Sequence, residues 1–215
     1  LSCFSPKDKN FTHYLPDEHG NSLSYHNVHA LCMDGDDLWI GTYTGGVNVL
    51  NTKTGVFRVY TTKAGDPTTL DRSSSYAIFK DREARIWVTS MSGVNLYNRE
   101  EDNFTRIRDL GSWIMDIDQD ADGNIWFSSQ GNGLFKYDPD KQEWTNYVHS
   151  GAPGALINDQ VNCVLIDGNG EMWIGTMNGL CKYNAKEDQF ELIPLDIPCL
   201  LYTSDAADEA RSVDL

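Results

Sequence analysis

The stretch "VHALCMDGDDLWIGTYTGGVNVLNTKTGVFRVY", residues 28–60, decides the fold class of this chain. It divides into four short apolar segments, at residues 28–34, 38–42, 47–51 and 57–60, which are separated by turns rich in Gly, Asn and Asp. These turn residues tolerate the positive φ angles of tight hairpins. No part of the chain repeats apolar residues at a helical period over ten or more positions. The stretch therefore predicts four consecutive antiparallel strands.

The same pattern recurs three times further along the chain. "IWVTSMSGVNLYN" begins at Ile86, "IWFSSQGNGLFKYD" at Ile125 and "MWIGTMNGLCKYN" at Met172, and each has a tryptophan second and a glycine turn after it. The repeat tryptophans are Trp39, Trp87, Trp126 and Trp173, and each is followed by a further aromatic residue, Phe57, Phe104, Trp144 or Phe190. A repeat of about 40–45 residues made of short strands is typical of a propeller blade.

We therefore predict an all-β fold, a β-propeller of four-stranded antiparallel blades that forms an open arc of about four blades plus a remnant. The expected partial propeller spans residues 1–198, with the remnant at 1–26 and repeats near 27–73, 74–112, 113–159 and 160–198. Sheets arranged face to face around an axis need large side chains between them. The repeat tryptophans are accordingly expected to pack between neighbouring blades, because each buries a large area.

The end of the chain does not continue the repeat. The segment "CLLYTSDAADEARSVDL", residues 199–215, resembles a translated transposon-end sequencing adaptor followed by a short index and a primer. We interpret it as a non-native tail and exclude it from fold reasoning. The chain is accordingly interpreted as a fragment at both ends.

Charge and composition exclude some function classes. The chain carries 32 acidic and 17 basic residues, a net charge of −15, so neither nucleic acid nor an anionic membrane surface is an expected partner. Outside the expected tail, the cysteines are Cys3, Cys32, Cys163 and Cys181. They lack metal-ligand spacing, and those in predicted strands are expected to be buried thiols. We expect no cofactor and no metal site.

The turn "DQDADGNIWFSS" offers Asp118, Asp120, Asp122 and Gly123 at four positions of a calcium-binding loop. The twelfth position of such a loop should be a bidentate Glu, but it is Ser129, and a strand rather than a helix follows. A hairpin turn that uses Asp and Gly for backbone geometry is the favoured interpretation.

The repeats resemble the two-component regulator propeller repeat, which reads roughly V-x-x-I-x-x-D-x-x-G-x-L-W-I-G-T-x-x-G-G-L-x-x-Y-D. Residues 28–60 match it nearly throughout and residues 161–190 almost as well, whereas the second and third copies replace I-G-T with "VTS" and "FSS". The resemblance implies the sensor region of a hybrid two-component histidine kinase. Such a region would lie in the periplasmic portion of an inner-membrane receptor and detect oligosaccharides from the breakdown of complex carbohydrates.

Loop lengths locate the expected ligand face. With the strands of a blade named a to d in chain order, the d–a connections vary in length, and they emerge on the same face as the b–c turns. Trp113 holds an indole where the other copies have Asn27, Ser74 and Gln160. Stacking on a sugar ring and packing under a short connection both remain open for it. The candidate ligand-binding residues are Trp113, Tyr43, Tyr76, Asn27, Gln130, Asn132, Asn162 and Asn178.

No catalytic constellation is evident, so the fragment is not predicted to be an enzyme. His13, His19, His26, His29 and His149 fall at unrelated repeat positions, and Asp116 and Asp118 share one face of an inner strand, where they could line a water-filled channel. A streptogramin-lyase-like enzyme and a structural propeller for protein contacts are the alternative functions. The expected partners are an oligosaccharide and the other blades of the parent chain, and a homodimer is compatible with both.

Overall fold

The computed structural model describes residues 1–17 and 20–194. The expected tail at residues 199–215 and the side chain of His19 lie outside the described residues. Within them, eighteen strands form four sheets of four strands and one two-stranded hairpin. In every sheet the strands lie in chain order, and each is antiparallel to the next.

Each four-stranded sheet is one blade. Blade 1 contains β3 (Val28–Asp34), β4 (Asp37–Thr42), β5 (Val47–Asn51) and β6 (Phe57–Tyr60). Blade 2 contains β7 (Ser75–Lys80), β8 (Ile86–Ser90), β9 (Gly93–Asn98) and β10 (Asn103–Asp109). Blade 3 contains β11 (Ile114–Gln119), β12 (Ile125–Ser129), β13 (Leu134–Asp138) and β14 (Glu143–Tyr147). Blade 4 contains β15 (Val161–Ile166), β16 (Met172–Thr176), β17 (Gly179–Asn184) and β18 (Gln189–Leu192).

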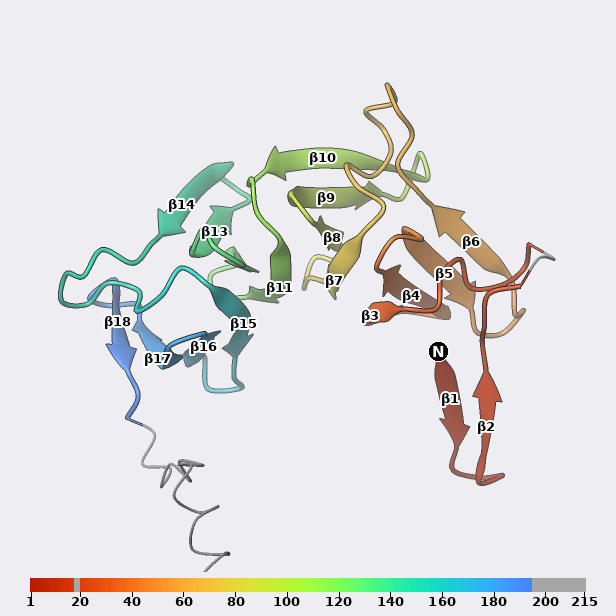
Figure 1. Ribbon diagram of the computed structural model, residues 1–215, viewed down its shortest axis with the longest axis horizontal. Coiled ribbons are helices and arrows are strands. Elements are labelled where there is room, and N and C mark those ends of the chain that lie inside the picture. The colour runs from red at the N-terminus through yellow and green to blue at the C-terminus, as the bar shows by residue number, and fades with distance from the viewer. Residues whose placement is uncertain (18–19, 195–215) are drawn as a thin grey trace, which may run out of the picture.

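The blades are arranged around a common axis as an open arc (Figure 1). Strands β3, β7, β11 and β15 lie on the inner side of the arc, and β6, β10, β14 and β18 lie on its outer side. The all-β propeller fold is therefore confirmed. The predicted strands of the first repeat match the observed ones, except that β4 begins one residue earlier, at Asp37.

The repeat tryptophans fill the space between adjacent blades. Trp39, Trp87 and Trp126 are each at most 1% exposed. The ring of Trp39 lies 4.7 Å from that of Tyr97 in blade 2, and the ring of Trp126 lies 5.1 Å from that of Tyr183 in blade 4. Trp173 is only half-buried, because it lies on the face of blade 4 that no further described blade covers.

In blades 2 and 3 the aspartate directly after the inner strand binds the indole of its own blade. Asp81 accepts a hydrogen bond from Nε1 of Trp87 at 2.7 Å, and Asp120 accepts one from Trp126 at 2.8 Å. The carboxylate of Asp120, one of the calcium-like positions, therefore binds the indole of its own blade and has a structural role. The turn of blade 1 is one residue shorter, and there Trp39 Nε1 is buried without a hydrogen-bond partner among the described residues.

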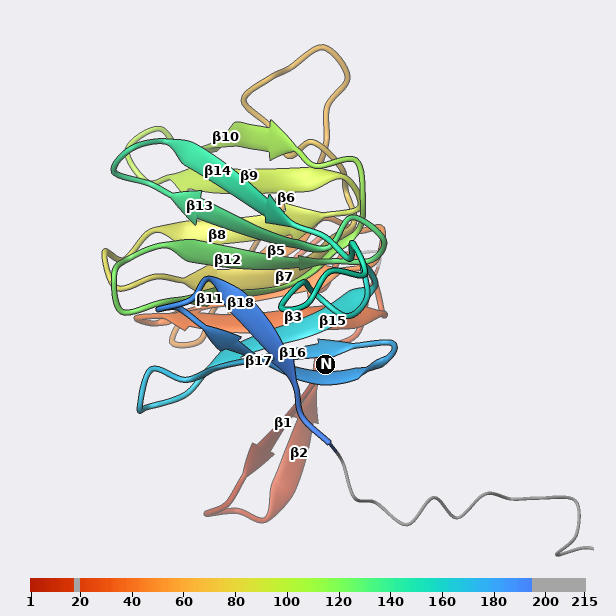
Figure 2. The same ribbon diagram turned by 90° about the vertical axis from the view of Figure 1, so that its left-hand side faces the viewer.

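The N-terminal hairpin corresponds to the outer half of a preceding blade. It comprises β1 (Ser2–Ser5) and β2 (Asn10–His13), and Figure 2 shows it projecting from the side of the arc. Tyr14, just after β2, meets the ring of Phe57 edge-on at 6.1 Å. Tyr60 meets Phe104 in the same way at 5.4 Å, so the hairpin occupies the place of strands c and d.

No helix in the described part of the chain is long and apolar enough to cross a membrane.

Candidate ligand-binding face

The d–a connections and the b–c turns lie against one another on one side of the arc. The backbone N–H of Tyr43 donates to the carbonyl of Asn27 at 3.0 Å, and that of Gln130 donates to the carbonyl of Trp113 at 2.9 Å. In Figure 2 the arrows of β10 and β14 both point toward this side, which lies at the right of the view. We call this side the loop face.

A buried leucine anchors every d–a connection. Leu23, Leu70, Leu110 and Leu156 are each at most 7% exposed although they lie outside the strands. In blades 1 and 2 a buried asparagine of strand c adds a second anchor, because Asn48 accepts from the N–H of Ser24 at 2.8 Å and Asn95 accepts from that of Asp71 at 3.0 Å. These leucines were not among the predicted residues, although each lies four or five residues before an inner strand.

Every inner strand contains a β-bulge near its start. The register shifts between Val28 and Ala30 in β3 and between Ser75 and Ile78 in β7, and β11 and β15 shift at the corresponding positions. A bulge re-aims the side chain that it inserts, and bulges are frequent beside functional sites. The bulged residues include His29, Tyr76, Met115 and Asn162.

Two of these bulged residues belong to a row of four rings at the loop face. The ring of His29 lies 5.8 Å from that of Tyr43 and 5.0 Å from that of Tyr76. The indole of Trp113 stacks on Tyr76, with ring centroids 5.6 Å apart and an angle of 19° between the planes. We call Tyr43, His29, Tyr76 and Trp113 the aromatic row, and it links blades 1, 2 and 3.

The aromatic row combines exposed and buried surface. Trp113 is 40% exposed, His29 is exposed, and Tyr43 is half-buried. Tyr76 is only 8% exposed, and burial raises the pKa of its phenol, as does the nearby Tyr43. The structure thus brings together the three predicted aromatic candidates and adds His29, whose place in a bulge the sequence pattern did not reveal.

The predicted polar candidates are more widely distributed. Asn132 donates its side-chain amide to the carbonyl of Leu110 at 2.9 Å, so this group supports a connection. Asn162 donates to the sulfur of Met177 at 3.5 Å, in the same pair of repeat positions that His29 and Tyr43 occupy in blade 1. The other three candidates lie in connections and turns of the loop face, namely Asn27, Gln130 and Asn178.

Asp116 and Asp118, which share one face of the inner strand β11, are both half-buried and both hydrogen-bonded to the backbone of blade 4. Asp116 accepts a hydrogen bond from the backbone N–H of Val164 at 3.1 Å, and Asp118 accepts one from that of Ile166 at 2.6 Å. Both donors belong to β15, whose edge faces blade 3. The two carboxylates therefore occupy otherwise unpaired N–H groups of an edge strand and tie blade 3 to blade 4.

The burial expected for the strand cysteines holds only for Cys181, since Cys32 is half-buried and Cys163 is exposed. Cys163 takes the repeat position of Asp116, which in blade 3 faces the following blade. No described blade follows blade 4, so the thiol is uncovered.

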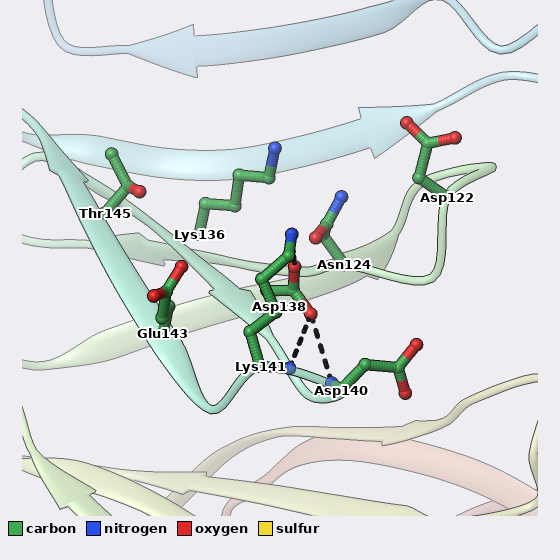
Figure 3. A pocket seen from close by; sticks show the side chains of 8 residues that line it. All are labelled: Asp122, Asn124, Lys136, Asp138, Asp140, Lys141, Glu143 and Thr145. Carbon is green, nitrogen blue, oxygen red and sulfur yellow. Dashed lines mark hydrogen bonds and ion pairs between the residues drawn. The ribbon is translucent and has the colours of Figure 1, made fainter.

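A hollow of about 460 Å³ lies on blade 3, at the end opposite the loop face (Figure 3). Its wall includes Asp122, Asp138, Asp140, Lys136 and Lys141, and Asp138 pairs with Lys141 at 2.6 Å. The hydrogen bonds from Lys141 lower the pKa of Asp138. Among the described residues no group of three or more His, Cys, Asp or Glu side chains could hold a metal ion. The wall of this hollow is mostly charged, whereas the aromatic row exposes apolar ring surface, so we keep the aromatic row as the candidate site.

The family model of the two-component regulator propeller matches residues 22–44 and 155–178. Each match runs from an anchored d–a connection through strands a and b, in blades 1 and 4. The predicted resemblance to the two-component regulator propeller repeat is thus confirmed for these two stretches. It is also 29% identical over 184 residues to histidine kinase P4 of Formosa agariphila, an alignment that covers 80% of this chain and 13% of that protein.

Solved structures with the same fold include a chain named as the extracellular domain of a hybrid two-component system from B. thetaiotaomicron. It superposes with a TM-score of 0.75 at 23% identity and covers 85% of this chain and 26% of that one. A second domain so named from B. thetaiotaomicron gives 0.67 at 20% identity, covering 80% of this chain and 22% of that one. PorZ of Porphyromonas gingivalis, a surface component of the type-IX secretion system, gives 0.61 at 16%, covering 83% and 28%. The chain thus spans about a quarter of the length of these structures.

Proposed function

We propose that this chain is part of the extracytoplasmic ligand-sensing region of a two-component signalling receptor, and that the ligand is an oligosaccharide from carbohydrate breakdown. The propeller repeats and the likeness to a histidine kinase and to extracellular domains of two-component systems support the receptor class. The periplasmic location and the kinase output are parts of the same proposal.

The observation that carries the ligand class is the half-exposed indole of Trp113 on the loop face. An aromatic ring offers a flat apolar surface to the apolar face of a sugar, and neighbouring polar groups can bind its hydroxyls. Trp113 rests on Tyr76, so its ring is presented by a rigid inner strand. The structure favours neither alternative function. The metal site that a streptogramin-lyase-like enzyme would need has no counterpart in residues 1–17 and 20–194.

The test is calorimetric titration of the parent receptor's sensor region with oligosaccharide pools, beside the variants Trp113→Ala and Trp173→Ala. Trp113→Ala should weaken binding by about 1–3 kcal/mol, as truncation of an aromatic anchor does. Trp173→Ala is the control because it truncates a tryptophan at the inter-blade repeat position, outside the aromatic row. Equal affinity for the wild type and Trp113→Ala would remove the proposed site.

A further inference from the structure

The hydroxyl of Tyr76 is the one tyrosine hydroxyl that is buried without a hydrogen-bond partner in the described part of the chain. Two other inter-blade tyrosines have paired hydroxyls, since Tyr97 donates to Asp102 at 2.6 Å and Tyr147 donates to Asp188 at 2.8 Å. A buried polar group left unpaired costs stability, and a native structure that keeps one calls for an explanation.

The side chains that contact the ring of Tyr76 point to a ligand rather than to a packing role. Tyr76 contacts His29 on one side and Trp113 on the other, and both of these rings are exposed. A phenylalanine would make the same ring contacts without the unpaired oxygen. The hydroxyl therefore adds nothing to the packing of the free protein.

His29 supplies a second polar group at the centre of the aromatic row. Its ring is tilted by 40° to Tyr43 and by 49° to Tyr76, so neither neighbour stacks flat against it. The bulge in β3 inserts it toward the loop face, at the position that Tyr76 holds in blade 2. The imidazole can donate or accept a hydrogen bond according to its tautomer.

We propose that His29 and Tyr76 form the hydrogen-bonding centre of the aromatic row and determine which ligand it accepts. The inference rests on the proposed function, and it assigns the ligand a ring with hydroxyl groups that lies on Trp113. The bound ligand turns the exposed imidazole of His29, hydrogen-bonds to it, and gives the Tyr76 hydroxyl the partner that it lacks. A site built in this way rejects rings without hydroxyls, because its own buried polar group would then stay unpaired.

The experiment compares Tyr76→Phe and His29→Phe in the full chain, titrated by calorimetry with neutral oligosaccharide pools from partial hydrolysis of cellulose, xylan, mannan and galactan. Both variants should bind at least tenfold more weakly than the wild type. Tyr76→Phe should keep or raise the melting temperature, because it removes an unpaired buried hydroxyl. A purely structural tyrosine would show the opposite pattern.

Two matched controls separate recognition from stability. His26→Phe changes an exposed histidine that pairs with Tyr25 at 4.4 Å outside the aromatic row, and it should leave affinity unchanged. Tyr97→Phe removes a paired hydroxyl and should lower the melting temperature without changing affinity. If Tyr76→Phe and His29→Phe bind like the wild type while Trp113→Ala does not, the hydrogen-bonding centre is wrong and the proposed function stands. If the wild type binds none of the pools, both are overturned.

Discussion

The junctions between blades 1 and 2 and between blades 3 and 4 share a device that the junction between blades 2 and 3 lacks. Tyr60 and Tyr97 both donate their hydroxyls to Oδ1 of Asp102. Tyr147 and Tyr183 both donate to Oδ1 of Asp188. We call each set a tyrosine latch, and in each the aspartate belongs to the c–d turn and has a φ of 53°.

The junction between blades 2 and 3 replaces two members of the latch. Gln142, with a φ of 58°, takes the position of Asp102. Arg108 pairs with Val94 as Tyr60 pairs with Val47, so an arginine takes the position of the first tyrosine. Its guanidinium lies over the ring of Trp144, 5.3 Å from the centroid. A cation–π interaction therefore joins blades 2 and 3 at this position, without the carboxylate that two tyrosines share in each latch.

This difference shows which contacts between blades can vary in this repeat. The tryptophan packing is present at all three junctions, whereas the latch is absent where the d–a connection is shortest and Trp113 reaches the loop face. We infer that the packing specifies the propeller and that the outer contacts can be exchanged around the candidate site.

The largest expected effect separates covered from uncovered tryptophans. Trp126→Ala should lower the free energy of unfolding by about 3–5 kcal/mol, because it leaves a cavity between blades 3 and 4. Trp173→Ala changes the same repeat position on the half-buried face and should cost only about 1–2 kcal/mol, since less area is lost. Chemical denaturation of the full chain measures both. Equal losses would mean that the face of blade 4 is covered in solution.

The latch itself is tested by Asp188→Ala. We expect a loss of about 1–2 kcal/mol, because two partly buried phenols lose a charged acceptor. Burial, together with the bond to Asp188, raises the pKa of Tyr147 to about 12, so the latch donor stays protonated at ordinary pH. Gln142→Ala is the control at the junction without a latch and should change stability by less than about 0.5 kcal/mol. A loss as large for Gln142→Ala would show that the turn, not the carboxylate, matters.

Much of this comparison could be predicted from the sequence, and the reasons for the rest are physical. Turn residues and apolar runs located the strands of residues 28–60 because both signals are local. Sequence spacing would align Ile107 with Tyr60, but the bulge between Arg106 and Arg108 moves Arg108 into that position. No residue type in the sequence marks the position of this bulge. The bulge at His29 is equally unmarked, so its place in the aromatic row could not be predicted either.

Asp188 and Asp116 should change the free energy of unfolding in opposite directions as the pH falls. The bond from Tyr183 lowers the pKa of Asp188, so its stabilisation is present above the ordinary value of 3.8 and is lost as the pH falls through its lower folded value. Burial raises the pKa of Asp116, and the charge of Asp118 adds to this, although Val164 and Ile117 donate to it. The folded protein therefore binds more protons there, and this group favours folding increasingly as the pH falls from neutral toward 4.

Asp116→Asn keeps an oxygen that can accept from Val164 and removes the titration. We expect its gain in unfolding free energy over the wild type to be greatest at pH 7 and to shrink at pH 4. Asp188→Asn should show its deficit at pH 7 and lose it only under strongly acidic conditions. Denaturation curves at several pH values measure both differences. A gain for Asp116→Asn that does not change with pH would mean that Asp116 titrates at its ordinary value.

The smallest expected effect comes from installing a latch where none exists. Arg108→Tyr and Gln142→Asp together should place a phenol and a carboxylate as in the other two junctions, with Tyr137 as the second phenol. Each single variant should be neutral or destabilising, because Arg108→Tyr loses the contact with Trp144 and Gln142→Asp adds an unpaired charge. A double-mutant cycle should give a favourable coupling of about 0.5–1.5 kcal/mol, the net value of one hydrogen bond. The gain is kept small because Trp144 is bulkier than Phe104 at the same position and already stacks on Tyr137 at 4.6 Å. Zero coupling would mean that the indole excludes the latch, and that the cation–π contact is the only arrangement this junction accepts.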